Sequence, residues 1–245
     1  MKAISLKKAG KVILLGAALL IGATYLAKLA WTMSGSSKWE LELEKDGIAV
    51  YSYKAPGAYM KQFKGVMRAK YTQSQVVAAL MLDNHSLDNC KAWIPECIEL
   101  KVLEPYTDRA QGDSVLWTLE LLPPVFKNRE YVIKSLTSQD PATKVVAIDI
   151  MAAANKVPLN DCCVRITHIH NRWQLTPVAP GEIELQLVQD FSMGGLFPDF
   201  LLNLAGADET YKLFHDTLPG LMNKAKYRSA TFDYIDEGRP ASAAL

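Results

Sequence analysis

The chain has 245 residues, of which 49% are hydrophobic and 22% carry a charge, and its formal net charge at pH 7 is +1. This length suits one large domain or two small ones, and the near-neutral balance gives no indication of a nucleic-acid partner or of an enzyme for acidic substrates. No internal repeat or low-complexity segment interrupts the sequence. The main part of the chain is therefore expected to be globular, with ample apolar material for a core.

An uncharged apolar run, Val12 to Ala27, follows four lysines near the N-terminus. A helix needs about 20 apolar residues to cross a membrane. The run reaches that length if it extends to Trp31, with the Lys28 ammonium reaching toward the interface and the rings of Tyr25 and Trp31 lying at it. Residues 1–33 are therefore predicted to be a membrane anchor or signal sequence, followed by a polar linker over residues 34–38.

The lysines also indicate the orientation of this segment, because an excess of positive charge stays on the cytoplasmic side. The protein is then expected in the cell inner membrane, single-pass, with its domain on the periplasmic side. The alternative is a cleaved signal peptide and secretion to the periplasm. The anchor is favoured because the run lacks a good A-x-A cleavage site, and no cysteine that could carry a lipid anchor follows it before Cys90.

The four cysteines leave two interpretations open. Cys90 and Cys97 are close enough in sequence to pair across a turn, and an oxidising compartment permits such pairing. Cys162 and Cys163 are neighbours, which rarely pair with each other. The other interpretation is that all four are free thiols.

The first third of the domain is predicted to mix helices and strands. Asp46-Gly47 and Ala55-Pro56-Gly57 are turn signals. Between and after these signals, the sequence predicts one or two helical turns over Trp39–Lys45, strands over Ile48–Tyr53 and Lys61–Tyr71, a helix from Thr72 or Ser74 to Met81 or Leu82, and an irregular, partly helical passage to Trp93.

A series of strands is predicted after Pro95, because alternating apolar segments are separated by Gly, Pro, Asn and Asp turns. The expected strands are Ile98–Leu103, Asp113–Leu121, Glu130–Thr137, Val145–Ala152, Val164–Leu175 and Ile183–Phe191.

A long helix is predicted to follow the Gly194-Gly195 break. Pro198 suits a first helical turn, and Pro219 is expected to kink or interrupt the late part. Apolar residues recur at helical spacing: Phe200, Leu201, Leu204, Tyr211, Phe214, Leu218, Leu221, Met222 and Ala225. Helices at both ends with six or more antiparallel strands between them predict an α+β domain over residues 39–228, with a tail over 229–245.

Several motifs match one family in order and spacing over some 190 residues. They are Trp39 with Asp46-Gly47-Ile48-Ala49-Val50-Tyr51, Trp93, Arg129-Glu130-Tyr131-Val132, Arg165 with Trp173-Gln174-Leu175-Thr176-Pro177, and Asp190–Asn203 with its Gly194-Gly195 and Pro198. From about Trp39 to Arg228, the chain resembles the StAR-related lipid transfer (START) domain.

The resemblance implies a helix-grip fold, in which a curved antiparallel sheet grips the C-terminal helix around a tunnel. Such domains carry one sterol, phospholipid or similar lipid, use no cofactor and do no chemistry. The C-terminal helix and the loop Leu122–Asn128 would form the gate, and the loop tip would contact a membrane surface. The expected lipid-binding residues are Trp93, Trp117, Glu120, Phe126, Arg129, Phe197, Leu201, Asn203, Leu204 and Leu218.

Some cholesterol-carrying members place a buried acid and a buried arginine in the cavity. Glu120 matches the acid, but the place of the arginine falls on Ser135, and Lys134 would point to the opposite face of the strand. The ion pair is therefore not reproduced. The resemblance implies lipid binding in general rather than cholesterol specificity.

No catalytic or metal site is expected. His168 and His170 share one strand face, but Cys162 would be about 20 Å away from His168 along a straight strand. No G-x-S-x-G or Gly-rich phosphate loop is present. A monomeric lipid carrier is the main hypothesis. The alternatives are a cyclase-like or hydrolase-like enzyme that uses Glu120 on a hydrophobic substrate, and a lipid sensor.

Overall fold

The computed structural model describes residues 6–82, 86–107, 112–121, 123 and 125–237. Its first half contains α1 (Leu6–Met33), β1 (Trp39–Lys45), β2 (Ile48–Tyr53), β3 (Gln62–Ala69), α2 (Gln73–Val77), the π-helical turn η1 (Ala78–Leu82), α3 (Leu87–Trp93), β4 (Cys97–Glu104) and β5 (Asp113–Leu119). Its second half contains β6 (Asn128–Gln139), β7 (Val146–Ala152), β8 (Cys163–Arg165), β9 (His170–Ala179), β10 (Glu182–Gln189), α4 (Asp199–Lys212), the π-helical turn η2 (Leu213–Thr217), α5 (Leu218–Met222) and α6 (Ala225–Arg228).

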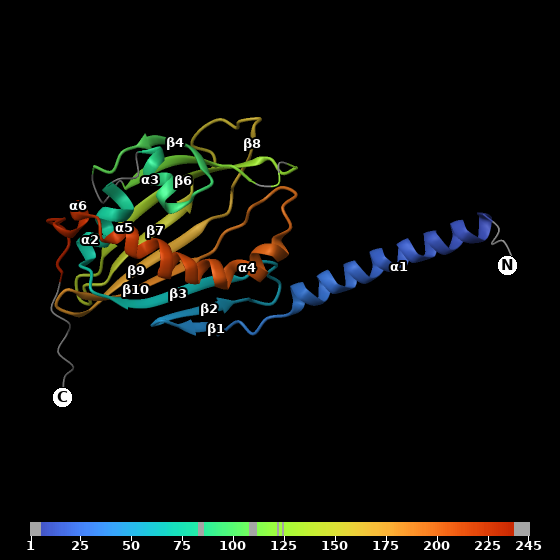
Figure 1. Cartoon of the computed structure of the whole chain (residues 1–245), viewed down its shortest axis with the longest axis horizontal. Coiled ribbons are helices and arrows are strands. Elements are labelled where there is room, and N and C mark those ends of the chain that lie inside the picture. The colour runs from blue at the N-terminus through green and yellow to red at the C-terminus, as the bar shows by residue number, and fades with distance from the viewer. Residues whose placement is uncertain (1–5, 83–85, 108–111, 122, 124, 238–245) are drawn as a thin grey trace.

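The strands form one sheet in the order β1-β2-β3-β10-β9-β7-β6-β5-β4, and short β8 pairs in parallel with the start of β6. All other pairings are antiparallel. The sheet curves around the C-terminal helical segment, which crosses its concave face (Figure 1). The α+β helix-grip prediction is confirmed.

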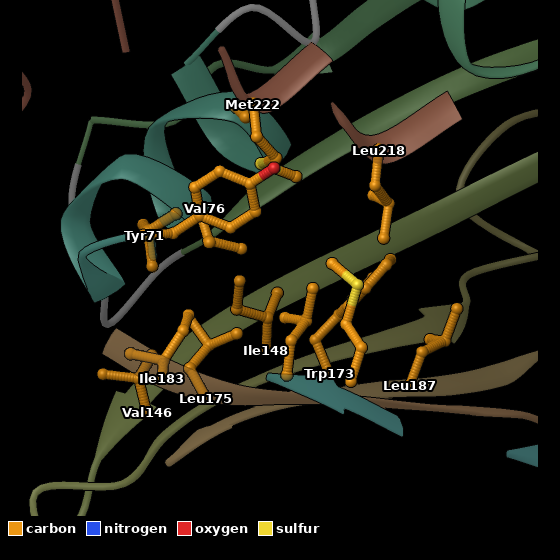
Figure 2. Close-up of a cluster of buried hydrophobic side chains, with 14 of the residues drawn as sticks. Tyr71, Val76, Val146, Ile148, Trp173, Leu175, Ile183, Leu187, Leu218 and Met222 are labelled. Carbon is orange, nitrogen blue, oxygen red and sulfur yellow. The ribbon is translucent and has the colours of Figure 1, made fainter. Parts of the chain in front are cut away.

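The main core lies where this segment and α2 meet the sheet. Figure 2 shows Met222 and Leu218 above Ile148, Trp173 and Leu175, with other side chains filling the space between. The strands bury alternate residues, as a sheet with one covered face must. A smaller core beneath α3 is built on β4, β5 and β6.

Two glycines let the helical segment approach β3 closely. A Cβ on Gly206 of α4 would lie 2.1 Å from Phe63 of β3, and a Cβ on Gly65 of β3 would lie 2.4 Å from Phe214. Each aromatic ring occupies the space that a side chain would take, so the two elements interlock.

The prediction of helical turns over Trp39–Lys45 is wrong. This segment is β1, paired with β2 from Trp39↔Tyr53 to Lys45↔Ile48. Its sequence, WELELEK, has the period of a strand, and Asp46 and Gly47 both have positive φ, as a two-residue hairpin turn requires. The Asp-Gly signal therefore marks a hairpin and not the end of a helix.

The single strand predicted over Val164–Leu175 is also wrong, because the chain changes partners within it. β8 pairs with β6, whereas β9 pairs with β7 and β10. The remaining predicted strands are present with small shifts in their ends.

The helix boundaries follow local chemistry. The Thr72 hydroxyl accepts a hydrogen bond from the Gln75 N–H and caps α2, as predicted. Pro198 is the N-cap of α4. The predicted interruption near Pro219 is confirmed, because η2 separates α4 from α5 just before this proline, which has no N–H to continue the helix.

All four cysteines form disulfides. Cys90 pairs with Cys97, which settles the alternative left open by the sequence. Cys162 pairs with its neighbour Cys163, against the expectation for adjacent cysteines. The second bridge lies in the exposed connection that leads into β8.

The helix α1 projects away from the domain (Figure 1). Its segment Ile13–Met33 has 21 residues, is strongly apolar and is largely exposed. By length and composition this segment is able to cross a membrane.

Candidate functional site

A cavity of about 350 Å³ lies between the concave face of the sheet and α4. Side chains from β3, β5, β6, β7, β9 and β10 form one wall, and η1, α3, α4 and the start of η2 form the other. The predicted helix-grip arrangement therefore encloses a space and not only a packed core.

Most of the cavity wall is apolar. Aromatic and aliphatic side chains predominate: Phe63, Leu80, Met81, Trp93, Ile94, Trp117, Ile133, Ile150, Ile169, Trp173, Leu187, Phe191, Leu202 and Leu213. The rings of Trp93 and Trp173 meet edge-on with centroids 6.5 Å apart. Binding of hydrocarbon to such a surface is favourable, because it removes apolar surface from water.

A polar strip crosses this apolar wall. Ser135 lies opposite Ile150, which lies opposite Asn171, and Gln189 continues the strip on β10. The Asn171 Oδ1 accepts a hydrogen bond from the Asp190 N–H at 3.1 Å, and the Gln189 Oε1 accepts one from the Thr210 hydroxyl at 2.9 Å. The amide NH₂ groups of Asn171 and Gln189 and the indole N–H of Trp117, which is buried without a hydrogen-bond partner, are donors in the described cavity lining.

The charged residues of the described lining are Lys61 and Glu209. Lys61 forms an ion pair with Glu42 at 2.7 Å, and its hydrogen bond lowers the pKa of Glu42. Glu209 pairs with Lys212 at 2.7 Å on the exposed side of α4. Both charges therefore have partners at the surface, and the interior of the cavity presents neutral groups.

Two of the ten predicted lipid-binding residues, Trp93 and Trp117, line this cavity. Leu218 is fully buried in the main core. Leu201 and Leu204 are 40% and 77% exposed, because α4 is rotated so that Leu202, Gly206 and Thr210 face the sheet. The apolar spacing identified the helix correctly but not its inward face.

The predicted place of Glu120 in the cavity is wrong. Trp117 points inward on β5, so Thr118 and Glu120 point to the other face, where Glu120 is exposed. Ser135, which takes the place of the family's arginine, does line the cavity.

Arg129, Phe126 and Phe197 form a separate cluster beside the cavity. The Arg129 side chain is buried and donates to the carbonyls of Met193 at 2.7 Å and Gly194 at 3.1 Å. Burial lowers the pKa of Arg129, and its guanidinium lies 5.8 Å from the Phe197 ring centroid. The rings of Phe126 and Phe197 are 5.7 Å apart. This cluster fixes the chain that leads into α4.

Asn203 also has a structural role. Its Oδ1 accepts from the Lys61 N–H at 2.7 Å, and its Nδ2 donates to the Tyr59 carbonyl at 3.1 Å. These two bonds tie α4 to the connection between β2 and β3. Leu122 and Pro124 of the predicted gate loop lie outside the described residues.

His168 lies between β8 and β9 and His170 begins β9, so the two do not share one strand as predicted, and both are paired with carboxylates. His168 lies 2.7 Å from Asp190, and His170 lies 3.5 Å from Asp149. Within the described part of the chain, no group of three or more His, Cys, Asp or Glu side chains is arranged to hold a metal ion.

No protein-family model matches the sequence, and no curated protein matches it either. Solved structures do match. A STAR-related lipid transfer protein from Xanthomonas axonopodis has a TM-score of 0.65 and 21% identity, with 76% of this chain and 99% of that chain covered. Human STARD10 has a TM-score of 0.63 and 15% identity, with 80% and 77% covered. Human StAR-related lipid transfer protein 5 has a TM-score of 0.60 and 13% identity, with 84% and 96% covered. The domain that follows α1 therefore has the fold of the StAR-related lipid transfer (START) domains.

Proposed function

We propose that the protein binds a single hydrophobic lipid in the cavity between the sheet and α4, at a membrane surface and without catalysis. The observation that carries this proposal is the apolar cavity, lined by Trp93, Trp117 and Trp173. Burial of hydrocarbon there contributes about 25 cal/mol per Å². Lipid transfer by the solved structures of the same fold supports the proposal as an analogy.

The cavity favours a neutral lipid of sterol size or with a single chain. Its volume is about 350 Å³, near the lower end of the roughly 300–1,000 Å³ typical of ligand pockets. This size disfavours a phospholipid with both acyl chains enclosed. A buried charge without a partner is costly, whereas a hydroxyl or carbonyl oxygen could accept hydrogen bonds from Asn171 and Gln189.

The proposed location is the periplasmic side of the cell inner membrane, with α1 as the span. Lys11 and the lysines before it suit the cytoplasmic end. The two disulfides support an oxidising compartment for the domain. A soluble periplasmic form would need removal of α1. We propose that the protein acts as a monomer.

A size change in the cavity wall tests the proposed site. Ile150 lies between Ser135 and Asn171 in the cavity, so the larger ring of Ile150→Trp narrows it, whereas Met151→Trp on the other face of β7 is the matched control. Lipids extracted from each purified protein are identified by mass spectrometry, and uptake from liposomes is measured. We expect wild type and Met151→Trp to carry lipid and Ile150→Trp to lose it, with all three equally folded by circular dichroism. Absence of lipid from folded wild type, before and after incubation with liposomes, would refute the proposal.

Transport and sensing predict different results in a second assay. A carrier moves lipid between donor and acceptor liposomes at a rate that depends on protein concentration, whereas a sensor binds lipid without net transfer. For the enzymatic alternative, the exposed position of Glu120 outside the described cavity lining argues against this residue as the acid.

A further inference from the structure

The C-terminal end of α1 is held by a buried lysine of the domain. The Lys54 side chain is 7% exposed. Its Nζ donates to the carbonyls of Trp31 and Ser34, both at 2.7 Å, and lies 5.0 Å from the Trp31 ring centroid. The last carbonyls of a helix have no partner within the helix and carry partial negative charge. Lys54 therefore caps α1 from within the domain.

Other bonds join the same helix end to the connection between β2 and β3. The Trp31 indole N–H donates to the Tyr59 carbonyl at 2.9 Å, and the Gly57 N–H donates to the Thr32 carbonyl at 2.7 Å. The Lys28 ammonium lies 5.2 Å from the Tyr59 ring centroid. Three residues at the end of α1 thus contact two residues of one turn.

The segment after α1 also packs closely against the domain. Gly35 has a φ of +123°, and a Cβ there would lie 2.4 Å from the Lys54 carbonyl oxygen. The same carbonyl accepts a hydrogen bond from the Ser37 N–H at 3.2 Å. The stretch expected to be a polar linker is therefore packed against the domain.

We propose that α1 is retained in the mature protein as a rigidly joined part of the domain, and that this junction fixes which face of the domain lies on the bilayer that α1 enters. Removal of α1 would take the Trp31 carbonyl and the Trp31 ring away from the Lys54 ammonium, so the domain would lose these hydrogen-bonding and packing contacts. A cleavable leader or a flexible tether would not require these contacts between the end of α1 and the domain. The inference goes beyond the proposed function and rests on it only in placing α1 in a membrane.

The junction sets the position of α4. The Tyr59 carbonyl accepts from both Trp31 of α1 and Asn203 of α4, so one oxygen links the two helices. Burial raises the pKa of Asp199, the first residue of α4, and the Lys28 charge opposes that shift. Figure 1 shows that α1 leaves the domain at the end where α4 begins.

An exposed apolar surface lies at this end of the domain. Leu196, Phe200 and Leu204 are 94%, 60% and 77% exposed. A bilayer entered by α1 lies beside these side chains, and aromatic and leucine side chains insert readily at its interface. Leu202 and Gly206 on the other side of α4 line the cavity. The proposed junction therefore holds the cavity next to the membrane that α1 enters. The domain is not free to turn toward another membrane.

The full chain, expressed in a Gram-negative host and isolated from its membranes, tests retention. We expect its intact mass to include α1. A mature protein that begins after Met33 would overturn the proposal.

The orientation is tested in vesicles of phosphatidylcholine that contain a spin-labelled quencher lipid. A fluorophore is placed on Leu204→Cys, or on Glu182→Cys at the start of β10, which lies at the far end of the domain (Figure 1). We expect strong quenching at position 204 and none at 182. Lys54→Met should abolish the quenching at 204, whereas Lys64→Met, on the neighbouring strand β3, should leave it unchanged. Equal quenching at both positions, or no effect of Lys54→Met in a folded protein, would overturn the proposal. Neither readout depends on a bound lipid, so failure here is distinct from failure of the proposed function.

Discussion

Removing one partner of the buried ion pair between Glu130 of β6 and Arg165 of β8 should strongly destabilise the domain. The Glu130 Oε2 lies 2.7 Å from the Arg165 Nε and 2.5 Å from its Nη2, and the two side chains are 4% and 5% exposed. The same guanidinium donates to the carbonyls of Val157 at 3.1 Å and Pro158 at 2.8 Å. Arg165 therefore holds the connection before β8 as well as the carboxylate.

The expected cost follows from the burial of both charges. Arg165→Met leaves the Glu130 carboxylate buried alone and should lower the free energy of unfolding by about 3–5 kcal/mol. Glu130→Gln removes a charged hydrogen-bond partner but leaves Arg165 bonded to carbonyls, so its cost should be about 2 kcal/mol. The double variant has no lone buried charge, and its cost should be well below the sum of the two.

Guanidinium unfolding of the full chain in mild detergent, followed by tryptophan fluorescence, measures these values. Arg172→Met is the control, because Arg172 is half exposed and its pair with Asp149 at 3.2 Å is a surface contact whose loss should cost at most about 1 kcal/mol. Additive costs in the double variant, within about 0.5 kcal/mol, would refute the reasoning.

The two disulfides should differ in their contribution. Replacing Cys90–Cys97 by alanines should lower the free energy of unfolding by about 2.5 kcal/mol, against about 1 kcal/mol for Cys162–Cys163, because the second closes a shorter loop; equal costs in thermal unfolding would contradict this. Tyr211 donates a hydrogen bond to Asp46, which raises its pKa to about 12, so stability should fall as pH rises from 10 to 12. In an NMR titration, Asp46→Asn should return the pKa of Tyr211 toward 10.0 and leave that of Tyr131, raised to about 12 by burial, unchanged; an unmoved Tyr211 would contradict the assignment.

The strands and the C-terminal helix could be predicted because their signals are local. Alternation and turn residues define most strands of the sheet, and the Gly194-Gly195 break with Pro198 defines the start of α4. The inward face of α4 could not be predicted in this way. Leu201 and Leu204 are as apolar as Leu202, but the close contact between Gly206 and Phe63 decides which side meets the sheet.

The misplaced residues were missed for related reasons. The inward position of Glu120 was taken from the resemblance. Because Trp117 points into the cavity, a residue three positions later points to the other face of the sheet. Nothing in the sequence distinguishes Lys54 from any other lysine that follows a strand. Its role as a cap depends on the contact with the end of α1, which only the structure shows. The inward positions of Asn171 and Gln189 could have been predicted from strand alternation, because each lies two residues from an inward apolar residue, Trp173 and Leu187 respectively.

The π-helical turn η2 divides the C-terminal segment into two parts with different freedom. On the α5 side, Leu218 and Met222 are fully buried, whereas within α4, which the structure describes completely, Thr210 alone is buried. Moving α4 away from the sheet would break the Gly206–Phe63 contact and the two Asn203 hydrogen bonds but would expose little of the main core. The contacts that hold α4 are thus few and local, whereas those that hold α5 belong to the main core.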